Sequence, residues 1–510
     1  MTDTTPITPA RRIALAWLVM IATMMQVLDS SIANVALPHM QAALNANLES
    51  VAWVLTSYIL ASAVATPVTG SIETLIGRRN LFVIAVAGFT LASMMCGAAP
   101  TLPAMVTSRV LQGLFGAMLM PLSQAVLLDI YPPEGRAKAI TIWSIGTMIG
   151  PIFGPVVGGW LTESFNWRWI FYINVPIGIV CTAGLWLLLD PARAIARKFD
   201  VAGFAYLATG LAAMQLMLDR GTQKDWFDST EILIELGLTI GAFWMFTIHT
   251  LTARDPLIPR ALLTNRNFMS AGLVGLIVSG VMYASQALMA PMLQQLLRYN
   301  TEQAGMLMMP RGLATMIAMM VAGPLTARID ARWVMGSGLV AMIIGQFIMS
   351  GFDIMMDSQP VIIAGIFQGA GIGLVAIPMM IVGFGTLPPL LRTDAAAIFS
   401  LVRNVSGSVG IAICTALVAR NYQVSHAELG GHVTQQSMPM LDDRLIHALG
   451  RAGGTVAAMV DAEVNRQALM IAYIDDFWLM MWGAAAAMPF VLMLRPRKPG
   501  KEEPAPAAAE

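Results

Sequence analysis

Long apolar segments separated by short polar ones follow one another along the chain from Ile13 to Leu494. The hydrocarbon core of a bilayer is about 30 Å thick, so a helix that crosses it needs roughly 20 apolar residues. Segments of this length lie near residues 13–37, 51–70, 80–99, 103–128, 138–161, 168–189, 200–218, 229–250, 270–293, 304–326, 333–351, 359–384, 396–419 and 477–494. The pattern predicts an all-α membrane protein with 14 transmembrane helices. An even number of crossings places both termini on the same side of the membrane.

The basic residues between these segments predict which side that is, because cytoplasmic loops carry an excess of Lys and Arg. Only a few fall in the short loops on the side opposite the termini: Arg168, Arg220, Lys224 and Arg298. The side of the termini carries many more, among them Arg11, Arg12, Arg78, Arg79, Arg136, Lys138, Arg193, Arg197, Lys198, Arg254, Arg260, Arg266, Arg328, Arg332 and those of the tail from Arg495 to Lys501. The bias places both termini in the cytoplasm.

Residues 420–476 form a polar segment on the predicted external side. Within it, apolar residues from Val456 to Ile471 recur at helical spacing opposite Asp461, Glu463 and Arg466, which predicts an amphipathic helix outside the membrane. Such a helix could lie on the bilayer surface or pack on its own loops. It could also form a docking surface for a partner protein. The pattern leaves these alternatives open.

The chain also repeats itself weakly. Gly70 to Arg79 (GSIETLIGRR) and Gly323 to Arg332 (GPLTARIDAR) each follow a predicted span and lie at a cytoplasmic turn. Internal repeats are typical of transporters, whose substrate site lies near the bilayer midplane at the repeat interface. We therefore predict a division into a cytoplasmic N-terminus (1–12), a six-helix bundle (13–189), two inserted linker helices (190–250), a second six-helix bundle (251–494) that includes the external segment, and a cytoplasmic tail (495–510).

Composition supports lipid as the solvent for most of the chain. Hydrophobic residues make up 57% of the sequence and charged residues 12%, and the mean hydropathy is +0.68. Soluble domains carry roughly 25% charged residues. The 30 Lys and Arg residues balance the 30 Asp and Glu residues, so no basic field supports nucleic-acid binding. The cysteines, Cys96, Cys181 and Cys414, lie in separate apolar runs and are interpreted as packing residues, with no metal site predicted.

Charged residues within the apolar segments are the first candidates for function. A charge at bilayer depth costs about 2.5–3.5 kcal/mol on insertion scales, so it is expected to face a cavity or a partner. Asp29 lies in the first span, Arg109 in the fourth, Arg311 in the tenth and Arg403 in the thirteenth. A carboxylate in a low-dielectric cavity can exchange a proton near neutral pH, which predicts a proton-coupling role for Asp29. The alternative is that Asp29 caps a helix end near the external interface.

Arg109 has two possible roles. A guanidinium does not release its proton, so Arg109 cannot carry one. It can hold a nearby carboxylate ionised, or it can be a purely structural arginine that binds backbone carbonyls.

Small residues form a further signal. Gly146, Gly150, Gly154 and Gly158 recur every four residues in the fifth span, which also holds Pro151, Pro155 and Gly159. Small residues at this spacing let another helix approach backbone to backbone. Gly365, Gly369 and Gly373 form a similar stripe in the twelfth span. Both stripes predict tight packing or a sealing surface between helices that move during transport.

Polar residues within the spans are candidates for a substrate cavity. By polarity and position we predict that this cavity is lined by Asn34, Gln112, Gln124, Tyr283, Gln286, Gln294 and Arg403. No cofactor is predicted.

Several motifs resemble those of the EmrB/QacA-type drug:proton antiporters, a group of the major facilitator superfamily with 14 helices. Asp29 to Pro38 (DSSIANVALP) resembles the first-helix motif of that group, and Arg109 to Gly116 (RVLQGLFG) is similar to the fourth-helix motif. Gly150 to Gly159 (GPIFGPVVGG) resembles the fifth-helix antiporter motif. Leu218 to Gly221 (LDRG) and Arg403 to Gly410 (RNVSGSVG) are similar to the EmrB branch. The resemblance covers nearly the whole chain and implies the major facilitator fold.

This resemblance also implies a function and partners. A member of this group is expected to export hydrophobic or amphipathic compounds by alternating access across the bacterial inner membrane, with the proton gradient as its energy source. The EmrB branch implies a tripartite pump with a periplasmic adaptor of the EmrA type and an outer-membrane channel of the TolC type. The arginine of the fourth-helix motif, here Arg109, is implicated in proton coupling.

One loop motif departs from the group. The family pattern after the second helix has an acidic residue four positions after the first glycine, Gly70. Here that position is Thr74, which follows Glu73, whereas Gly77, Arg78 and Arg79 match the pattern. The sequence leaves open whether Glu73 replaces the missing acid.

Other functions are less consistent with the sequence. An ATP-driven pump needs a GxxxxGK[ST] loop, and a membrane hydrolase needs HExxH or GxSxG; the chain contains none of these motifs. The chain is therefore predicted to be a secondary transporter and not an enzyme. An exporter of one metabolite, siderophore or fatty acid, an importer and a channel remain alternatives.

Overall fold

The computed structural model describes residues 8–46, 48–191, 199–388, 391–432 and 453–494, and the part of the chain so described is helical without β-strands. The helices of the first half are α1 (Pro9–Ala43), α2 (Leu48–Ala65), η1 (Thr66–Val68), α3 (Thr69–Ile76), α4 (Arg78–Ala98), α5 (Leu102–Gly116), α6 (Leu119–Ile130), α7 (Pro133–Ser164), α8 (Trp169–Tyr172), α9 (Asn174–Leu188), α10 (Val201–Arg220), η2 (Thr222–Lys224), η3 (Trp226–Asp228) and α11 (Thr230–Thr252). Those of the second half are α12 (Arg260–Thr264), α13 (Arg266–Pro291), η4 (Met292–Leu296), α14 (Thr301–Arg328), α15 (Ala331–Met349), α16 (Gln359–Gly385), α17 (Arg392–His432), α19 (Gly453–Ala486) and α20 (Met488–Leu492).

The predicted spans correspond to this helix order. Within the described ranges, 13 helices are long and apolar enough to cross a membrane. The remaining predicted span, 138–161, falls in α7, a 32-residue helix that packs along α1. Large apolar side chains on the outer helices are exposed, among them Trp244 of α11 and Phe347 of α15. Only lipid solvates such a surface, so the chain is a multi-pass membrane protein.

Several predicted spans are interrupted. The second consists of α2, the short η1 and α3, and Pro67 lies in η1, where a missing amide hydrogen interrupts the helical ladder. The fourth consists of α5 and α6, which are separated after Gly116. These interruptions lie within apolar segments, and the hydrophobic pattern alone does not reveal them.

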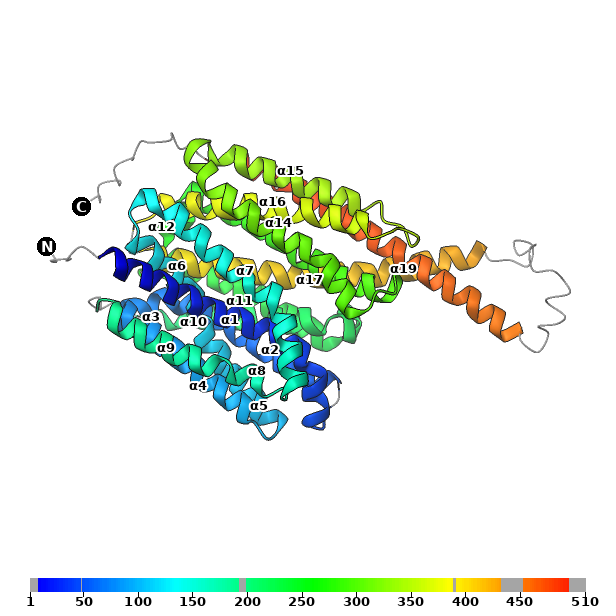
Figure 1. Ribbon diagram of the computed structural model, residues 1–510, viewed down its shortest axis with the longest axis horizontal. Coiled ribbons are helices and arrows are strands. Elements are labelled where there is room, and N and C mark those ends of the chain that lie inside the picture. The colour runs from blue at the N-terminus through cyan, green and yellow to red at the C-terminus, as the bar shows by residue number, and fades with distance from the viewer. Residues whose placement is uncertain (1–7, 47, 192–198, 389–390, 433–452, 495–510) are drawn as a thin grey trace.

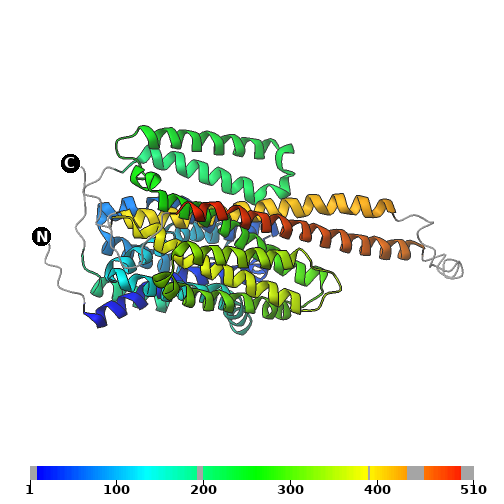
Figure 2. The same cartoon turned by 90° about the horizontal axis from the view of Figure 1, so that it is seen from above.

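The buried core is divided among several clusters of apolar side chains. One contains residues of α13 to α20, such as Met335 and Phe477. Another contains residues of α1, α4, α6, α7 and α9, such as Phe82 and Leu185. The helices α10 and α11 pack on each other and form the green pair along the upper edge of Figure 2. This pair contacts the remainder mainly through α2 and α17.

The external segment differs from the prediction. We predicted a polar loop at 420–476 with a separate amphipathic helix, but α17 continues to His432, and the predicted helix is the first part of α19, continuous with the last span. At 1.5 Å per residue, the 41 residues of α17 extend about 60 Å, about twice the thickness of the bilayer core. Figures 1 and 2 show α17 and α19 projecting beyond the bundle as a hairpin. The segment is not a separate helix, because α19 runs without interruption from it into the last span and packs on α17.

Polar contacts hold the two helices of the hairpin together. The Tyr422 hydroxyl donates to Asn465 Oδ1 at 2.5 Å, and His426 Nε2 lies 3.4 Å from Asp461 Oδ1. Residues 433–452 of the predicted external segment lie outside the described residues.

Candidate functional site: a buried Asp–Arg network and an ion-pair cluster

Asp29 and Arg109 form an ion pair inside the first helical bundle. Arg109 Nη1 of α5 lies 2.7 Å from Asp29 Oδ2 of α1, and both side chains are 1% exposed. Arg109 Nε donates to the carbonyl oxygen of Val54 in α2 at 2.9 Å. The guanidinium also lies 4.3 Å above the centroid of the Tyr58 ring. The pair thus joins α1, α2 and α5 in the interior, and Asp29 is not a helix cap: it lies mid-helix in α1.

Amide side chains complete the hydrogen bonding of the carboxylate. Gln112 Nε2 and Asn174 Nδ2 donate to Asp29 Oδ1 at 2.8 and 2.9 Å. Asn174 also donates to Ser93 Oγ at 3.0 Å, which connects α9 and α4 to the network. Gln112 Oε1 accepts from Arg109 Nη1 at 2.8 Å. Five helices therefore position a single carboxylate that has almost no exposed surface.

Glycines of the fourth-helix motif make this geometry possible. A Cβ atom on Gly113 would lie 2.5 Å from the Tyr58 carbonyl oxygen, and one on Gly116 would lie 3.1 Å from the Tyr58 hydroxyl. These glycines let α2 approach α5 so closely that Tyr58 covers the arginine. On the other side, a Cβ on Gly178 would lie 1.9 Å from Thr90 Oγ1, so this glycine brings α9 against α4. The spacing of the motif is thus explained by helix approach around the ion pair.

The chemistry available to this network is proton exchange at one position. A carboxylate with bound donors can accept a proton, whereas the guanidinium stays charged. Protonation of Asp29 would remove the charge that compensates Arg109 in a medium where an unpaired charge is costly. A change in protonation is therefore expected to change the packing of the helices that meet here.

The glycine stripe of α7 lies against α1. A Cβ on Gly150 would lie 2.8 Å from Val27 Cγ1 and 3.0 Å from the Leu28 nitrogen. The other members of the stripe meet α1 in the same way: Cβ atoms on Gly146, Gly154 and Gly158 would lie within 3 Å of Met20, Ser31 and Ile32. Gly159 differs, since a Cβ there would meet no atom within 4 Å. The side chains of Pro151 and Pro155 lie outside the described residues.

The stripe of α16 packs on α14. A Cβ on Gly369 would lie 2.1 Å from the Arg311 carbonyl oxygen, and one on Gly373 would lie 2.6 Å from that of Thr315. A Cβ on Gly365 would lie 3.4 Å from Arg311 Cβ. Arg311 Nη2 donates to the Met282 carbonyl at 3.1 Å, so this arginine joins α14 to α13.

The residues predicted to line a substrate cavity differ in their burial. Gln112 is fully buried in the Asp29 network, and Gln124 is buried in α6. Tyr283 packs against Gly407, Gln286 and Gln294 are exposed, and Arg403 is half-buried with Nη2 against Met120 Sδ. The side chain of Asn34 lies outside the described residues. That these residues line a common substrate cavity stays a prediction.

An ion-pair cluster joins helix ends at one end of the bundle. Asp129, at the end of α6, accepts hydrogen bonds from Arg78 of α4 and from Arg392 of α17, the latter at 2.5 Å. Arg78 Nε also donates to Glu73 Oε1 of α3 at 2.6 Å. We call Glu73, Arg78, Asp129 and Arg392 the ion-pair cluster. It connects helices of the first half of the chain with the start of α17 in the second half.

The loop motif supplies the backbone for this cluster. Gly77 has φ = 83°, the only positive φ among the glycines of the described part of the chain, and it ends α3 so that Arg78 can begin α4. A Cβ on Gly70 would lie 1.7 Å from Asp394 Oδ1 of α17, which explains the glycine there. Arg79 lies 4.2 Å from the Trp186 ring centroid. Thr74 donates to the Ser71 carbonyl of its own helix, and Glu73 instead contacts Arg78.

Asp129→Asn is expected to loosen this end of the bundle. The two arginines would lose their shared negative partner, and partly exposed ion pairs contribute up to about 1 kcal/mol each. Thr393, in the first turn of α17, is buried and lies 3.4 Å from Arg78 Nη2. In a Thr393→Cys background, labelling by a thiol reagent should accelerate on the order of tenfold when Asp129→Asn is added. Asp190→Asn, which removes the exposed partner of Arg11, is the matched control. Equal labelling in both variants would contradict a closing role for the cluster.

Sequence reasoning missed part of the site. Asn174, Ser93 and Tyr58 were not predicted, although Asn174 is an amide within an apolar run and could have been noticed on that ground. The Val54 carbonyl has no sequence signal. Asp129 and Arg392 were missed because each lies at a helix end. A charge there has little free-energy cost, so it does not stand out in the sequence as a candidate.

Comparisons with known proteins agree with this architecture. The profile of the Major Facilitator Superfamily matches residues 19–421. The "Multidrug export protein EmrB" of Haemophilus influenzae is 30% identical over 498 residues, which cover 96% of this chain and 97% of that protein. The "Fatty acid resistance protein FarB" of Neisseria gonorrhoeae is 31% identical over 471 residues, which cover 91% and 92%. A double-Trp mutant of XylE has a similar fold, with a TM-score of 0.59 at 13% identity over 96% of this chain and 97% of its own.

Proposed function

Because this chain belongs to the Major Facilitator Superfamily, and within it to the EmrB-type group, we propose that it is a secondary transporter that exports hydrophobic or amphipathic compounds in exchange for protons. The observation that carries this proposal is the buried Asp29 carboxylate, held by Arg109, Gln112 and Asn174 within apolar helices. An ionisable group is costly at this depth, and such residues mark ion pathways in membrane proteins.

In the proposed cycle, Asp29 carries the proton and Arg109 responds to it. The ionised carboxylate pairs with the guanidinium. Protonation removes the compensating charge, and Arg109 then depends on the Val54 carbonyl and on Gln112. The helices that carry these groups shift relative to one another, which exposes the cargo site on the other side of the membrane.

Two features support alternating access as the transport mechanism. The ion-pair cluster joins the two halves of the chain at one end through contacts that can break and form again. The glycine stripe of α7 lies directly against α1, the helix that carries Asp29. A change at Asp29 can therefore be transmitted along a tightly packed helix pair to the helix ends.

The orientation is proposed from the distribution of basic residues. We place the chain in the bacterial inner membrane with both termini in the cytoplasm, because the Lys and Arg residues concentrate at that end. The ion-pair cluster then lies at the cytoplasmic end, and the α17–α19 hairpin extends into the periplasm.

The experiment that tests this function measures export against a gradient. Purified protein in proteoliposomes with an imposed pH gradient should accumulate a fluorescent amphipathic cation, and a protonophore should abolish the accumulation. A deletion strain should become sensitive to members of a drug panel, and the resistance restored by the gene should disappear with the protonophore. Accumulation that does not depend on the pH gradient would contradict proton coupling. The absence of any accumulation would favour a channel, because a channel cannot concentrate the compound.

A fatty acid exporter is the second candidate. The similarity to FarB, 31% identical over most of both chains, favours it. Both candidates use the same proton site and differ in cargo. Long-chain fatty acids and cationic dyes can be compared in the same proteoliposomes.

We also propose that the hairpin of α17 and α19 docks a periplasmic adaptor of the EmrA type, which would connect the transporter to an outer-membrane channel of the TolC type. At 1.5 Å per residue, α17 is about 60 Å long and α19 about 50 Å long, and both exceed the roughly 30 Å of a membrane crossing. The projecting part of the hairpin is held by the Tyr422–Asn465 and His426–Asp461 contacts, so it can present a stable surface.

Replacing residues 427–460 by a short Gly-Ser linker is expected to remove most co-purification of the adaptor. The replacement preserves both interhelical contacts, so the bundle should fold and transport in proteoliposomes, which need no adaptor, should be unchanged. Drug resistance in cells should be lost. Undiminished adaptor binding by the shortened protein would refute docking at the hairpin.

A further inference from the structure

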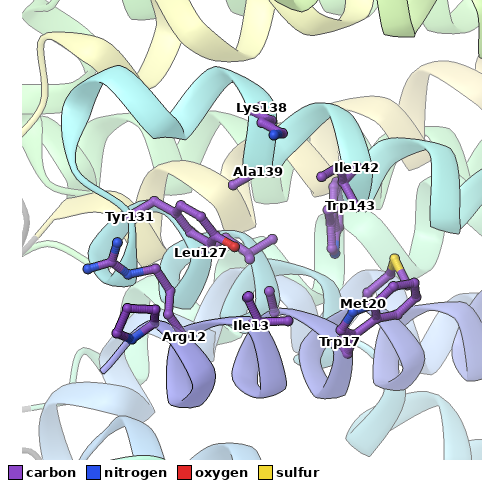
Figure 3. Close-up of a pocket in the computed structure, with 12 residues that line it drawn as sticks. Arg12, Ile13, Trp17, Met20, Leu127, Tyr131, Lys138, Ala139, Ile142 and Trp143 are labelled. Carbon is purple, nitrogen blue, oxygen red and sulfur yellow. The ribbon is translucent and has the colours of Figure 1, made fainter. Parts of the chain in front are cut away.

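A cavity lies between the N-terminal parts of α1 and α7, and none of the residues that line it belongs to the Asp29 network. It has a volume of about 380 Å³ and is lined by residues of α1, of the end of α6 and of α7. Figure 3 shows Arg12 and Lys138 on its rim, with Tyr131 between the two helices and Trp17 and Trp143 at the other end. Among the described residues, the contacts given above for the Asp29 network and for the ion-pair cluster involve none of these side chains.

The walls of the cavity are apolar and open toward lipid. Ile13 and Trp17 of α1 and Ile142 of α7 are exposed on its outer side, at 55%, 54% and 45%. The floor is formed by Met20, Leu127 and Trp143, which are buried. The cavity is therefore a groove on the membrane-facing side of the bundle. Tryptophan and tyrosine rings are typical of the depth at which lipid headgroups begin.

The rim carries positive charge that other side chains do not balance. Within the described residues, neither Arg12 nor Lys138 forms an ion pair, whereas Arg11, which precedes Arg12 in the chain, pairs with Asp190. Arg12 Nε is buried and has no hydrogen-bond partner there, and the guanidinium lies 5.7 Å from the Tyr131 ring centroid. A buried donor without an acceptor is costly unless a ligand supplies one.

We propose that this groove binds an anionic phospholipid, with Arg12 and Lys138 contacting its phosphate and one acyl chain lying along Ile13 and Trp17. Charge complementarity selects the occupant: the site offers two cations and an apolar wall open to lipid. Basic pockets between transmembrane helices on the cytoplasmic side are suited to anionic headgroups. The lipid would bridge the starts of α1 and α7, the two helices joined by the glycine stripe.

The test uses the purified, delipidated full chain and native mass spectrometry with added phosphatidylglycerol or phosphatidylcholine. We expect phosphatidylglycerol to bind more tightly. The variant Arg12→Gln with Lys138→Gln should weaken its binding on the order of 30-fold, since each basic residue near the surface contributes about one factor of five to the affinity. Arg254→Gln removes an exposed cation that lines no part of the groove and should leave binding unchanged.

Location is checked independently by fluorescence. Phosphatidylglycerol brominated on its acyl chains should quench tryptophan emission, and Trp17→Phe should reduce the quenched fraction. This readout keeps the proposal testable even if the double variant folds poorly.

Four results would overturn the proposal. The first two are equal affinity for the two lipids and unchanged binding in the double variant. The third is displacement of the lipid by millimolar inorganic phosphate, which would indicate a site for free anions. The fourth is displacement by an exported dye, which would make the groove an entrance for cargo. Lipid binding is measured without transport, so its failure is distinguishable from failure of the proposed export function.

Discussion

Asp29→Asn is expected to abolish pH-driven accumulation of cargo while leaving cargo exchange without a gradient in place. The side-chain amide of Asn does not take up and release a proton as a carboxylate does, so net transport loses its coupling to the pH gradient. Exchange of labelled for unlabelled cargo needs no proton movement and should continue. Both activities can be measured in the same proteoliposomes, with and without an imposed pH gradient.

The same variant should fold less stably, and this effect has to be separated from coupling. Asp29 Oδ1 accepts from Gln112 and Asn174, and Oδ2 accepts from Arg109. An amide nitrogen would place a donor opposite donors and leave the guanidinium without a negative partner. Removing one partner of a buried ion pair lowers the free energy of unfolding by about 3–5 kcal/mol. The thermal unfolding midpoint should therefore fall by several degrees, and adding Gln112→Glu should restore part of it by returning a carboxylate to the network.

Another buried acid offers a competing explanation. Asp476 of α19 is 1% exposed, and its Oδ2 has no hydrogen-bond partner among the described residues. If Asp476→Asn abolished pH-driven accumulation and Asp29→Asn did not, the proton carrier would have been assigned to the wrong half of the chain. Loss of exchange together with accumulation in Asp29→Asn would indicate that the residue is needed for helix movement as such.

The membrane spans could be predicted from sequence because their physical cause is local. A helix in lipid must satisfy its own backbone hydrogen bonds over a fixed thickness, so length and apolarity determine where it lies. The interruptions at η1 and after Gly116 were not predicted, since a break within an apolar run leaves the run apolar. The hairpin was predicted as a loop with a separate helix because its outer part is polar, although the structure extends the flanking spans through it.

The site could be predicted only as separate residues. Asp29 and Arg109 each stand out because charge in lipid is costly. Their pairing spans 80 positions and depends on how α1, α2 and α5 meet, which a single sequence does not specify. Likewise, the contact of Glu73 with Arg78 depends on how α3 and α4 meet at Gly77. Whether Glu73 takes the place of the acid missing at Thr74 stays a prediction.

Gly150→Leu is expected to stop transport by forcing α1 and α7 apart. The Cβ atom alone would approach the Leu28 backbone nitrogen to 3.0 Å, and Leu28 directly precedes Asp29. Backbone cannot move aside as the end of a flexible side chain can, so the whole of α1 must shift. Overpacking of this kind typically costs about 1–3 kcal/mol. Transport in proteoliposomes should be lost in the leucine variant and reduced in Gly150→Ala.

Gly159→Leu is the matched control, because it adds the same side chain to the same helix. A Cβ at Gly159 meets no atom within 4 Å, so this variant should fold and transport normally. Similar loss of transport in the two leucine variants would mean that α7 tolerates no bulk at all, and the contact with α1 would then not be the reason. Normal turnover by Gly150→Leu would contradict the proposal that transport depends on the close approach of α1 and α7. A helix pair that moves as one unit has no room for the added side chain beside Asp29, so normal turnover would mean that the two helices separate during the cycle.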